Sequence, residues 1–184
     1  MGDGALHLEE VSTPLGTVQV AAGPSGVAWI RLPGASLPSQ IVVAGVFEGE
    51  PVADPEGLAR EAAGQVEEYF AGTRREFDLP LDLGGLSEFQ RAVLAAAAQI
   101  PYGETASYRE MAISAGSPGA VRAAGTAMGA NPVPLLIPCH RVIRSDGTPG
   151  LYGGGEPLKR WLLDFEAGGI SRVGAESPRV ARSG

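Results

Sequence analysis

Two capping-box patterns in the middle of the chain limit its fold more than any other feature. Ser-Glu-Phe-Gln occupies 87–90 and Ser-Tyr-Arg-Glu occupies 107–110. In such a box the serine and the residue three positions later satisfy each other's free backbone N–H groups at a helix start. The two boxes predict helices over 87–99 and 107–114.

A third short helix is expected directly after these two. Ser117 is suited to cap it, Pro118 to occupy its first turn, and the helix reaches about Gly129. Because a turn with Gly116 joins it to the preceding helix, the pair is a candidate helix-turn-helix.

The first half of the chain has the pattern of strands and turns that is typical of a small antiparallel sheet. Short apolar segments within 6–32 are separated by turn residues at 13–16 and 23–26. A further strand is expected over 41–47. A helix over 55–71, capped by Asp54, follows the strands.

The fold class is therefore α+β, with a break at the glycine pair 84–85. We expect an N-terminal α/β domain over 1–84 and a mostly helical domain over 85–170 that ends with a helix over 156–166. The polar stretch 171–184 has no hydrophobic period, which predicts a disordered tail.

Composition narrows the function classes. No apolar run is long enough to span a membrane, and the N-terminus lacks the features of a signal peptide, so we expect a cytoplasmic protein without a membrane partner. One cysteine and two histidines allow neither an internal disulfide nor a Cys/His zinc site, so no metal site and no cofactor are expected.

Charge is unevenly placed along the chain. The net charge is −7, but residues 1–86 carry four Lys/Arg against thirteen Asp/Glu, whereas residues 101–165 carry six against five. The acidity belongs to the first half, which leaves the second half free to face DNA.

The only cysteine lies in the run Leu-Leu-Ile-Pro-Cys-His-Arg-Val-Ile-Arg at 135–144. An unpaired cysteine is often just a small buried hydrophobe. Here, however, a short strand is expected to end at Pro138, which would let Cys139 face a cleft. The neighbours His140, Arg141 and Arg144 would lower the pKa of its thiol, as a nucleophile requires.

The third predicted helix is composed almost entirely of small residues. Arg122 is its only charged residue between Gly119 and Ala130. Such a smooth surface can approach a flat partner closely but offers few donors for reading base edges. The alternative is that small residues merely allow tight helix packing.

Several motifs together resemble one family. They are Ile-Pro-Tyr-Gly-Glu-Thr-Ala-Ser-Tyr at 100–108, Asn-Pro at 131–132, Pro-Cys-His-Arg-Val at 138–142, Tyr-Gly-Gly-Gly at 152–155 and Lys-Arg-Trp-Leu-Leu at 159–163. They resemble the O6-alkylguanine-DNA alkyltransferases over roughly 89–166. The resemblance implies a ribonuclease H-like N-terminal domain and a winged helix-turn-helix-like second domain that carries the active-site cysteine.

The resemblance also implies a function. Members of this family repair DNA directly, moving the alkyl group of O6-alkylguanine, and of O4-alkylthymine, to a cysteine. The damaged base is flipped out of the duplex, because a buried thiolate cannot reach it in the stack. The partner is double-stranded DNA, each protein molecule acts once, and the protein is a monomer that can bind DNA cooperatively.

Roles of single residues follow from the resemblance. Cys139 matches the acceptor, His140 the base that takes its proton through a water, and Glu166 the carboxylate that orients the histidine. Asn131 matches a hinge residue, and Tyr108 matches a tyrosine that turns the target nucleotide and donates a proton to the departing guanine.

DNA contacts and pocket walls are implied in the same way. Arg122 matches an arginine finger that fills the vacated stack. The implied DNA contacts are Thr105, Ser107, Tyr108, Arg122, Ala123 and Ala127. The implied substrate-pocket residues are Met128, Val142, Tyr152, Gly153 and Gly154. Gly129 and Gly153 depart from the polar residues of many relatives, which predicts a weaker electrostatic grip and a roomier pocket.

Three other functions are compatible with parts of the sequence. A protein could bind alkylguanine without repairing it, although such proteins replace the cysteine. A cysteine hydrolase could use Cys139, His140 and Glu166, but adjacent Cys and His residues form a poor direct dyad. A helix-turn-helix regulator would need base-reading side chains on its third helix.

Overall fold

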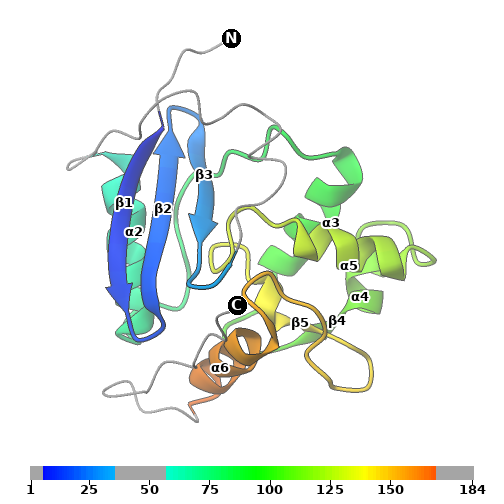
Figure 1. Ribbon diagram of the computed structural model, residues 1–184. Coiled ribbons are helices and arrows are strands. Elements are labelled where there is room, and N and C mark those ends of the chain that lie inside the picture. The colour runs from blue at the N-terminus through cyan, green and yellow to red at the C-terminus, as the bar shows by residue number, and fades with distance from the viewer. Residues whose placement is uncertain (1–5, 36–56, 169–184) are drawn as a thin grey trace, which may run out of the picture.

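The computed structural model describes residues 6–35 and 57–168. Within these ranges a three-stranded sheet and a helix lie beside a group of shorter helices (Figure 1). The strand expected over 41–47, the capping residue Asp54 and the predicted tail over 171–184 lie outside the described residues.

The N-terminal sheet is antiparallel, as predicted. Its strands β1 (His7–Thr13), β2 (Gly16–Gly23) and β3 (Gly26–Arg31) are paired in chain order. Val11 lies opposite Val18, and Val20 opposite Ile30, so that buried β-branched side chains face each other on the inner side of the sheet.

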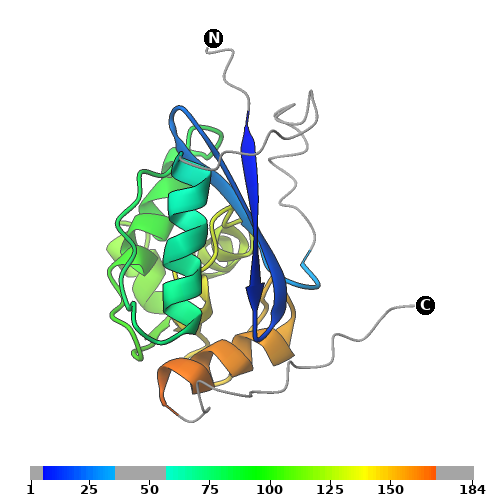
Figure 2. The ribbon, with the colours of Figure 1, turned by 90° about the vertical axis from the view of Figure 1, so that its left-hand side faces the viewer.

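Helix α2 (Leu58–Phe70) covers this inner side (Figure 2). Ala59, Ala62, Ala63 and Val66 have no exposed surface, and such short side chains let a helix approach a sheet closely. The helix begins three residues later than the predicted Pro55, because Gly57 is extended and serves as its N-cap.

Both capping boxes are confirmed. Ser87 and Gln90 exchange hydrogen bonds at the start of α3 (Glu88–Ala98), and Ser107 and Glu110 do so at the start of α4 (Tyr108–Ser114). Each box satisfies two backbone N–H groups, which fixes where the helix begins.

The third predicted helix starts later than expected. Helix α5 runs over Val121–Gly129 and not from Pro118. The Ala120 N–H donates to the Ser117 carbonyl (2.9 Å) and closes a turn, and Ala120 itself departs from helical geometry. Pro118 therefore lies in the turn that joins α4 to α5, and the two helices pack against each other.

The strand expected to end at Pro138 is not formed. Leu135 has a φ of +77°, which interrupts any strand, and Cys139–Arg141 forms a 3₁₀ turn, η1. The strands that flank the site are two residues long: β4 (Ala106–Ser107) and β5 (Val142–Ile143), which pair in parallel.

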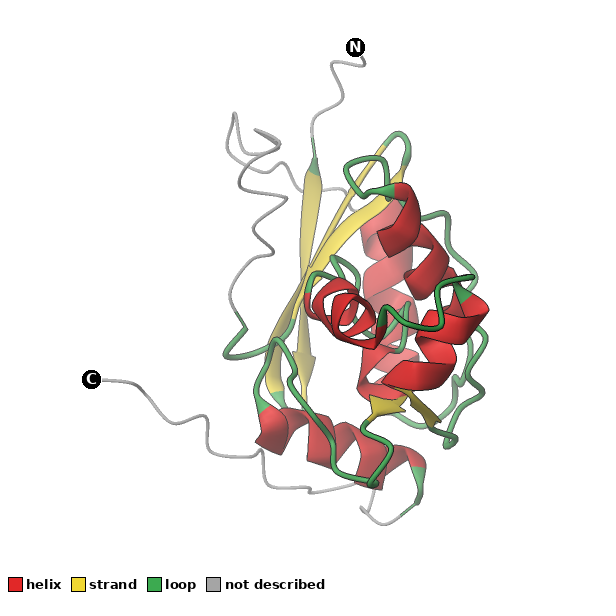
Figure 3. Ribbon diagram, turned by 90° about the vertical axis from the view of Figure 1, so that its right-hand side faces the viewer, coloured by secondary structure: helices red, strands yellow, loops and turns green. Residues whose placement is uncertain are grey.

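One cluster of buried side chains contains residues from both predicted domains. The final helix α6 (Glu156–Glu166) lies across one end of the sheet (Figure 3). Its Trp161 and Phe165 rings contact Phe70 of α2, with centroids 6.2 and 6.1 Å away. The N-terminal helix is thereby joined to the helix that carries Glu166.

Candidate active site

Cys139 is placed by a fixed loop over 131–138. The buried side chain of Asn131 donates to the Ile137 carbonyl (2.9 Å) and accepts from the Val133 N–H (3.1 Å). The Ile30 N–H of β3 donates to the Pro132 carbonyl (2.8 Å). The loop therefore has side-chain and backbone anchors, and Cys139 follows it with only 5% of its surface exposed.

The pKa of the Cys139 thiol is raised and not lowered, contrary to the sequence-based prediction. Burial raises the pKa of Cys139, while Asn131, Lys159 and Tyr152 act to lower it. The predicted influence of Arg141 and Arg144 on the thiol is wrong, because Arg141 binds Glu166 and Arg144 is exposed. The cation that favours the Cys139 thiolate is Lys159.

His140 has one paired ring nitrogen and one free one. Its Nε2 lies 2.8 Å from Glu166 Oε1, whereas the buried Nδ1 has no hydrogen-bond partner among the described residues. Beside a carboxylate, Nε2 carries the proton, which makes Nδ1 the acceptor. Burial lowers the pKa of His140 despite the nearby Glu166, so the ring is kept neutral and able to accept a proton.

Glu166 is the centre of a buried hydrogen-bond network. Arg141 donates from Nε to Oε2 (2.8 Å) and from a terminal nitrogen to Oε1 (2.9 Å). Tyr69 donates to Oε1 (2.7 Å), and the Gly103 N–H donates to Oε2 (3.1 Å). Burial alone would raise the pKa of Glu166, but the hydrogen bonds from His140 and Arg141 outweigh it and hold the pKa well below its ordinary value.

Lys159 is a second buried cation, on the same helix as Glu166. Its Nζ donates to the Val142 carbonyl (2.5 Å) and to the Tyr108 hydroxyl (3.2 Å). Burial lowers the pKa of Lys159 to about 8, and the nearby Cys139 opposes this shift. The resemblance had placed Lys159 in a family motif but gave it no role.

The predicted pocket residues divide into buried and open positions. Met128 and Val142 are buried, and the Tyr152 ring lies 5.9 Å from Lys159 Nζ with its hydroxyl enclosed. Gly153 is exposed, and a Cβ built there would meet nothing within 4 Å. A Cβ on Gly154 would lie 2.2 Å from the Leu158 side chain. The Leu158 side chain would therefore have to move.

The predicted DNA contacts also include both exposed and buried residues. Arg122 and Ala123 are exposed on α5, whereas Ala127 on the same helix is buried and has no surface to offer a partner. Gly125 of α5 faces the Tyr108 ring, where a Cβ would lie 3.8 Å away. Ala127 is therefore better explained by tight packing than by contact with DNA.

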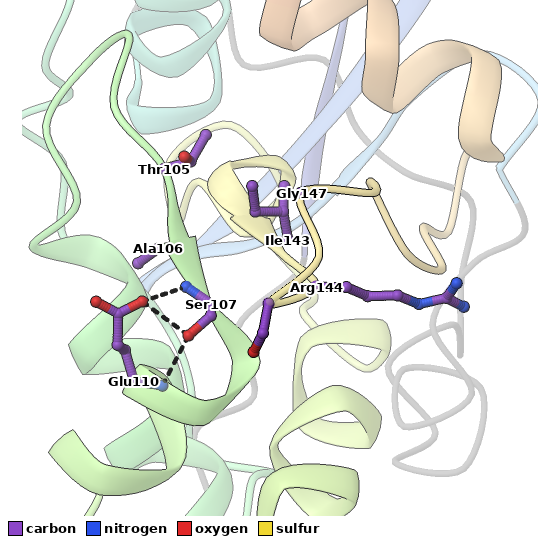
Figure 4. Close-up of a pocket in the computed structure, with 8 residues that line it drawn as sticks. Thr105, Ala106, Ser107, Glu110, Ile143, Arg144 and Gly147 are labelled. Carbon is purple, nitrogen blue, oxygen red and sulfur yellow. Dashed lines mark hydrogen bonds between the residues drawn. The ribbon is translucent and has the colours of Figure 1, made fainter.

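Thr105 and Ser107 line a surface pocket of about 280 Å³ beside β4 and β5. Figure 4 shows Glu110 hydrogen-bonded to Ser107 within it, and the Arg144 side chain pointing away from the other labelled residues. Cys139 is not among the residues that line this pocket.

Two classes of site are not found among the described residues. No helix in 6–35 or 57–168 has the length and apolar character of a membrane span. No three His, Cys, Asp or Glu side chains in these ranges are grouped to hold a metal ion.

Comparisons with known proteins show the family to which the chain belongs. Residues 88–168 match the family model described as "6-O-methylguanine DNA methyltransferase, DNA binding domain". A methylated-DNA-protein-cysteine methyltransferase of Methanothermobacter thermautotrophicus is 40% identical over 162 residues, which cover 88% of this chain and 84% of that protein. This chain belongs to the methylated-DNA-protein-cysteine methyltransferase family.

Further relatives agree with this assignment. The methyltransferase of Mycolicibacterium paratuberculosis is 54% identical over 110 residues, which span 58% of this chain and 66% of the relative. The crystal structure of Mycobacterium tuberculosis OGT in complex with DNA matches with a TM-score of 0.75 and 36% identity, covering 95% of this chain and 96% of that one. The predicted resemblance to alkyltransferases is confirmed.

Sequence reasoning missed three parts of this alkyltransferase site. Lys159, Tyr69 and Gly103 contact the thiol's surroundings or Glu166, but none was a candidate. Lys159 could have been found, because it and Glu166 lie seven residues apart, close to the apolar stripe of α6, where a charge is rarely buried without a partner. No local pattern marks Tyr69, since its partner is 97 residues away.

Proposed function

We propose that this protein repairs alkylated DNA directly by moving the alkyl group of O6-alkylguanine in a duplex to Cys139. A bond forms between Cys139 Sγ and the alkyl carbon as the bond from that carbon to O6 breaks. The observation that carries the proposal is the thiol itself, buried beside Lys159 and followed by a histidine whose free Nδ1 can accept a proton.

The thiol proton passes to His140 through a bridging water. Consecutive side chains of a 3₁₀ turn diverge by about 120°, which does not favour a direct contact between Cys139 and His140. Glu166 stabilises the imidazolium that results, and Lys159 stabilises the thiolate. With these two contacts the buried Cys139 can react as a thiolate while His140 carries its proton.

The departing guanine carries away the electron pair of the broken bond and needs a proton. Burial raises the pKa of Tyr108, so its hydroxyl stays protonated and able to donate. Lys159 donates to the same hydroxyl and can replace the proton that Tyr108 gives up. Donation in the transition state neutralises the charge that develops on the base.

The target base is flipped out of the helix to reach the thiol. Because Cys139 is only 5% exposed, a stacked base cannot present O6 to it. The exposed Arg122 fills the vacated position, and Ala123, Thr105 and Ser107 contact the duplex around it. Asn131 holds the loop before the thiol, and Met128, Val142, Tyr152, Gly153 and Gly154 bound the space for the base.

The product is a thioether to a saturated carbon, which water does not cleave, so each molecule acts once. We also propose that O4-alkylthymine is accepted, and that the protein acts in the cytoplasm as a monomer that can cooperate on DNA. A ribonuclease H-like domain over 1–84 and a winged helix-turn-helix-like domain over 85–170 are the corresponding fold proposal.

Intact mass spectrometry tests the proposal. The protein is incubated with a duplex that carries one O6-methylguanine, and the labelled peptide is mapped. We expect a single gain of about one methylene on Cys139. Cys139→Ser should bind the same duplex and gain nothing. An unchanged wild-type mass with tight lesion binding would instead indicate a damage-binding protein, and repeated turnover of an activated ester would indicate a hydrolase.

A further inference from the structure

Tyr69 of the N-terminal half touches the same carboxylate oxygen as the proposed base. Its hydroxyl donates to Glu166 Oε1 over 2.7 Å, and His140 Nε2 lies 2.8 Å from that oxygen. Tyr69 belongs to α2, whereas His140 and Glu166 belong to η1 and α6. One oxygen atom thus joins the N-terminal helix to the two elements that hold the site.

The Tyr69 ring is held firmly by its neighbours. It has no exposed surface, and the rings of Phe70, Phe77, Tyr102 and Phe165 lie 5.1 to 6.0 Å from it. A closely packed ring cannot swing its hydroxyl away from Glu166. The position of the donor is therefore set by the core that α2 forms with α6.

The hydroxyl acts as a donor over the whole working pH range. Burial raises the pKa of Tyr69 well above its ordinary value, and the charge of Glu166 raises it further. A proton that is always present on the tyrosine withdraws charge from Oε1. Less of that charge is then available to stabilise a proton on His140.

We propose that Tyr69 is a positioning residue for alkyl transfer: by fixing and partly neutralising Glu166 Oε1, it sets the orientation and the basicity of His140. The inference rests on the proposed function of Cys139 and His140. It gives the N-terminal half a part in the chemistry, because its helix supplies one of the hydrogen bonds that define the base.

Tyr69→Phe tests this with a minimal change, since it removes one oxygen and keeps the ring. His140 is faced by Glu166 and Lys159 of α6, by Arg141 of its own turn and by Tyr69 only through Glu166. Without the tyrosine, Glu166 Oε1 keeps more negative charge toward His140. The pKa of His140 is then expected to rise, and the acid limb of the pH-rate profile to move to higher pH with it.

The histidine can be observed directly, because the chain has only His7 and His140. NMR of protein labelled with ¹⁵N-histidine, with His7→Gln to assign the signals, gives the pKa of the His140 ring without any DNA. We expect Tyr69→Phe to raise the pKa of His140 above that in the wild-type protein. An unchanged His140 pKa would overturn the inference even if wild-type protein repairs DNA normally.

Transfer rates give the second readout. Tyr69→Phe should slow methyl transfer by about two- to tenfold near neutral pH, the effect of one hydrogen bond. The loss should be equal for a duplex and for free O6-benzylguanine, because the defect lies at the base and not in DNA binding. A loss confined to duplex DNA would contradict the role.

Phe77→Leu is the control for loosening of the cluster. Its ring lies in the same cluster, 5.7 Å from Tyr69, and the change loosens the packing without removing a hydrogen bond to Glu166. We expect this variant to leave the pKa of His140 and the pH-rate profile unchanged. Equal shifts in both variants would mean that general loosening of the cluster, and not the bond to Glu166, is responsible, and the inference would then fail.

Discussion

The Lys159 ammonium lies 3.2 Å from the Tyr108 hydroxyl, with no exposed surface of its own. The same ammonium donates to the Val142 carbonyl, so one buried cation joins α6 to the start of α4 and to β5. A buried charge is tolerated only with such partners. The arrangement places the cation near the thiol and ties it to the tyrosine that is proposed to serve the leaving group.

Replacing Lys159 should therefore disable the thiol. Lys159→Met keeps the length of the side chain and removes the charge that lowers the pKa of Cys139. We expect at least about tenfold slower alkyl transfer at pH 7, because loss of an interaction with a charged group costs about 1.5 kcal/mol or more and less of the thiol is then ionised. The pH dependence of Cys139 alkylation by iodoacetamide should move to higher pH.

Arg160→Gln provides the control for this change. Arg160 is the next residue of α6, but it is exposed and paired with Glu156 over 2.7 Å. Its loss should leave the thiol titration in place. If Lys159→Met and Arg160→Gln behaved alike, a specific role of Lys159 would be excluded.

Glu166 should dominate the stability of the site. Glu166→Gln leaves Arg141 buried without its anion, and breaking a buried pair in this way costs about 3–5 kcal/mol. The loss is measurable as the free energy of unfolding in urea at pH 7. The exposed Glu104→Gln is the control and should cost little.

The pH dependence of stability follows from the same carboxylate. Its folded pKa is lowered, so the unfolded chain binds more protons in acid, and the stabilisation is present above the ordinary pKa of 4.5 and lost as pH falls below it. Urea unfolding between pH 3 and 7 should show a steep acid limb in the wild type. The Glu166→Gln variant, which has no carboxylate to titrate at this position, should have a flatter limb.

Local signals in the sequence were sufficient for much of the fold. The capping boxes at Ser87 and Ser107 place two helix starts correctly, because both partners of each box lie within one turn. At Pro118 the same reasoning failed, since a proline after a serine suits a turn as well as a helix start. Pro118 lies in a turn because the Ala120 N–H donates to the Ser117 carbonyl, and no residue pattern predicts that hydrogen bond.

Sequence reasoning identified several residues of the site but few of the contacts between them. Cys139 and His140 lie in the Pro-Cys-His-Arg-Val motif, and Glu166 was matched through the family resemblance, yet Arg141 was expected beside the thiol and instead binds Glu166. The direction of the Arg141 side chain depends on the 3₁₀ turn over Cys139–Arg141, which was not predicted from the sequence. Contacts such as Tyr69 with Glu166 depend on how α2 packs against α6, which no sequence period encodes.

Gly150 should be needed for the position of Tyr108. It has a φ of +75°, and a Cβ there would lie 2.8 Å from the Tyr108 hydroxyl. Gly150→Ala therefore adds a clash to the backbone strain of about 1 kcal/mol that an alanine at positive φ brings. Gly147→Ala, at a φ of +84° with nothing within 4 Å of the new Cβ, carries the strain alone. Thermal unfolding should show a small loss for both variants, and transfer should be impaired only in Gly150→Ala.

Arg122 should matter only where a base has been flipped out of a duplex. Its exposed guanidinium lies on α5, apart from the buried network around Glu166, so Arg122→Ala leaves the thiol, His140 and Lys159 in place. We expect slower transfer from duplex O6-methylguanine and an unchanged rate with free O6-benzylguanine.

The control for the general loss of positive charge is Arg109→Ala, which removes an exposed arginine of α4. Because that general effect acts through phosphate binding, it should weaken as salt rises, whereas the loss of a stacking side chain should persist at high salt. An equal loss on both substrates would show that Arg122 supports the fold of the site and does not fill the stack.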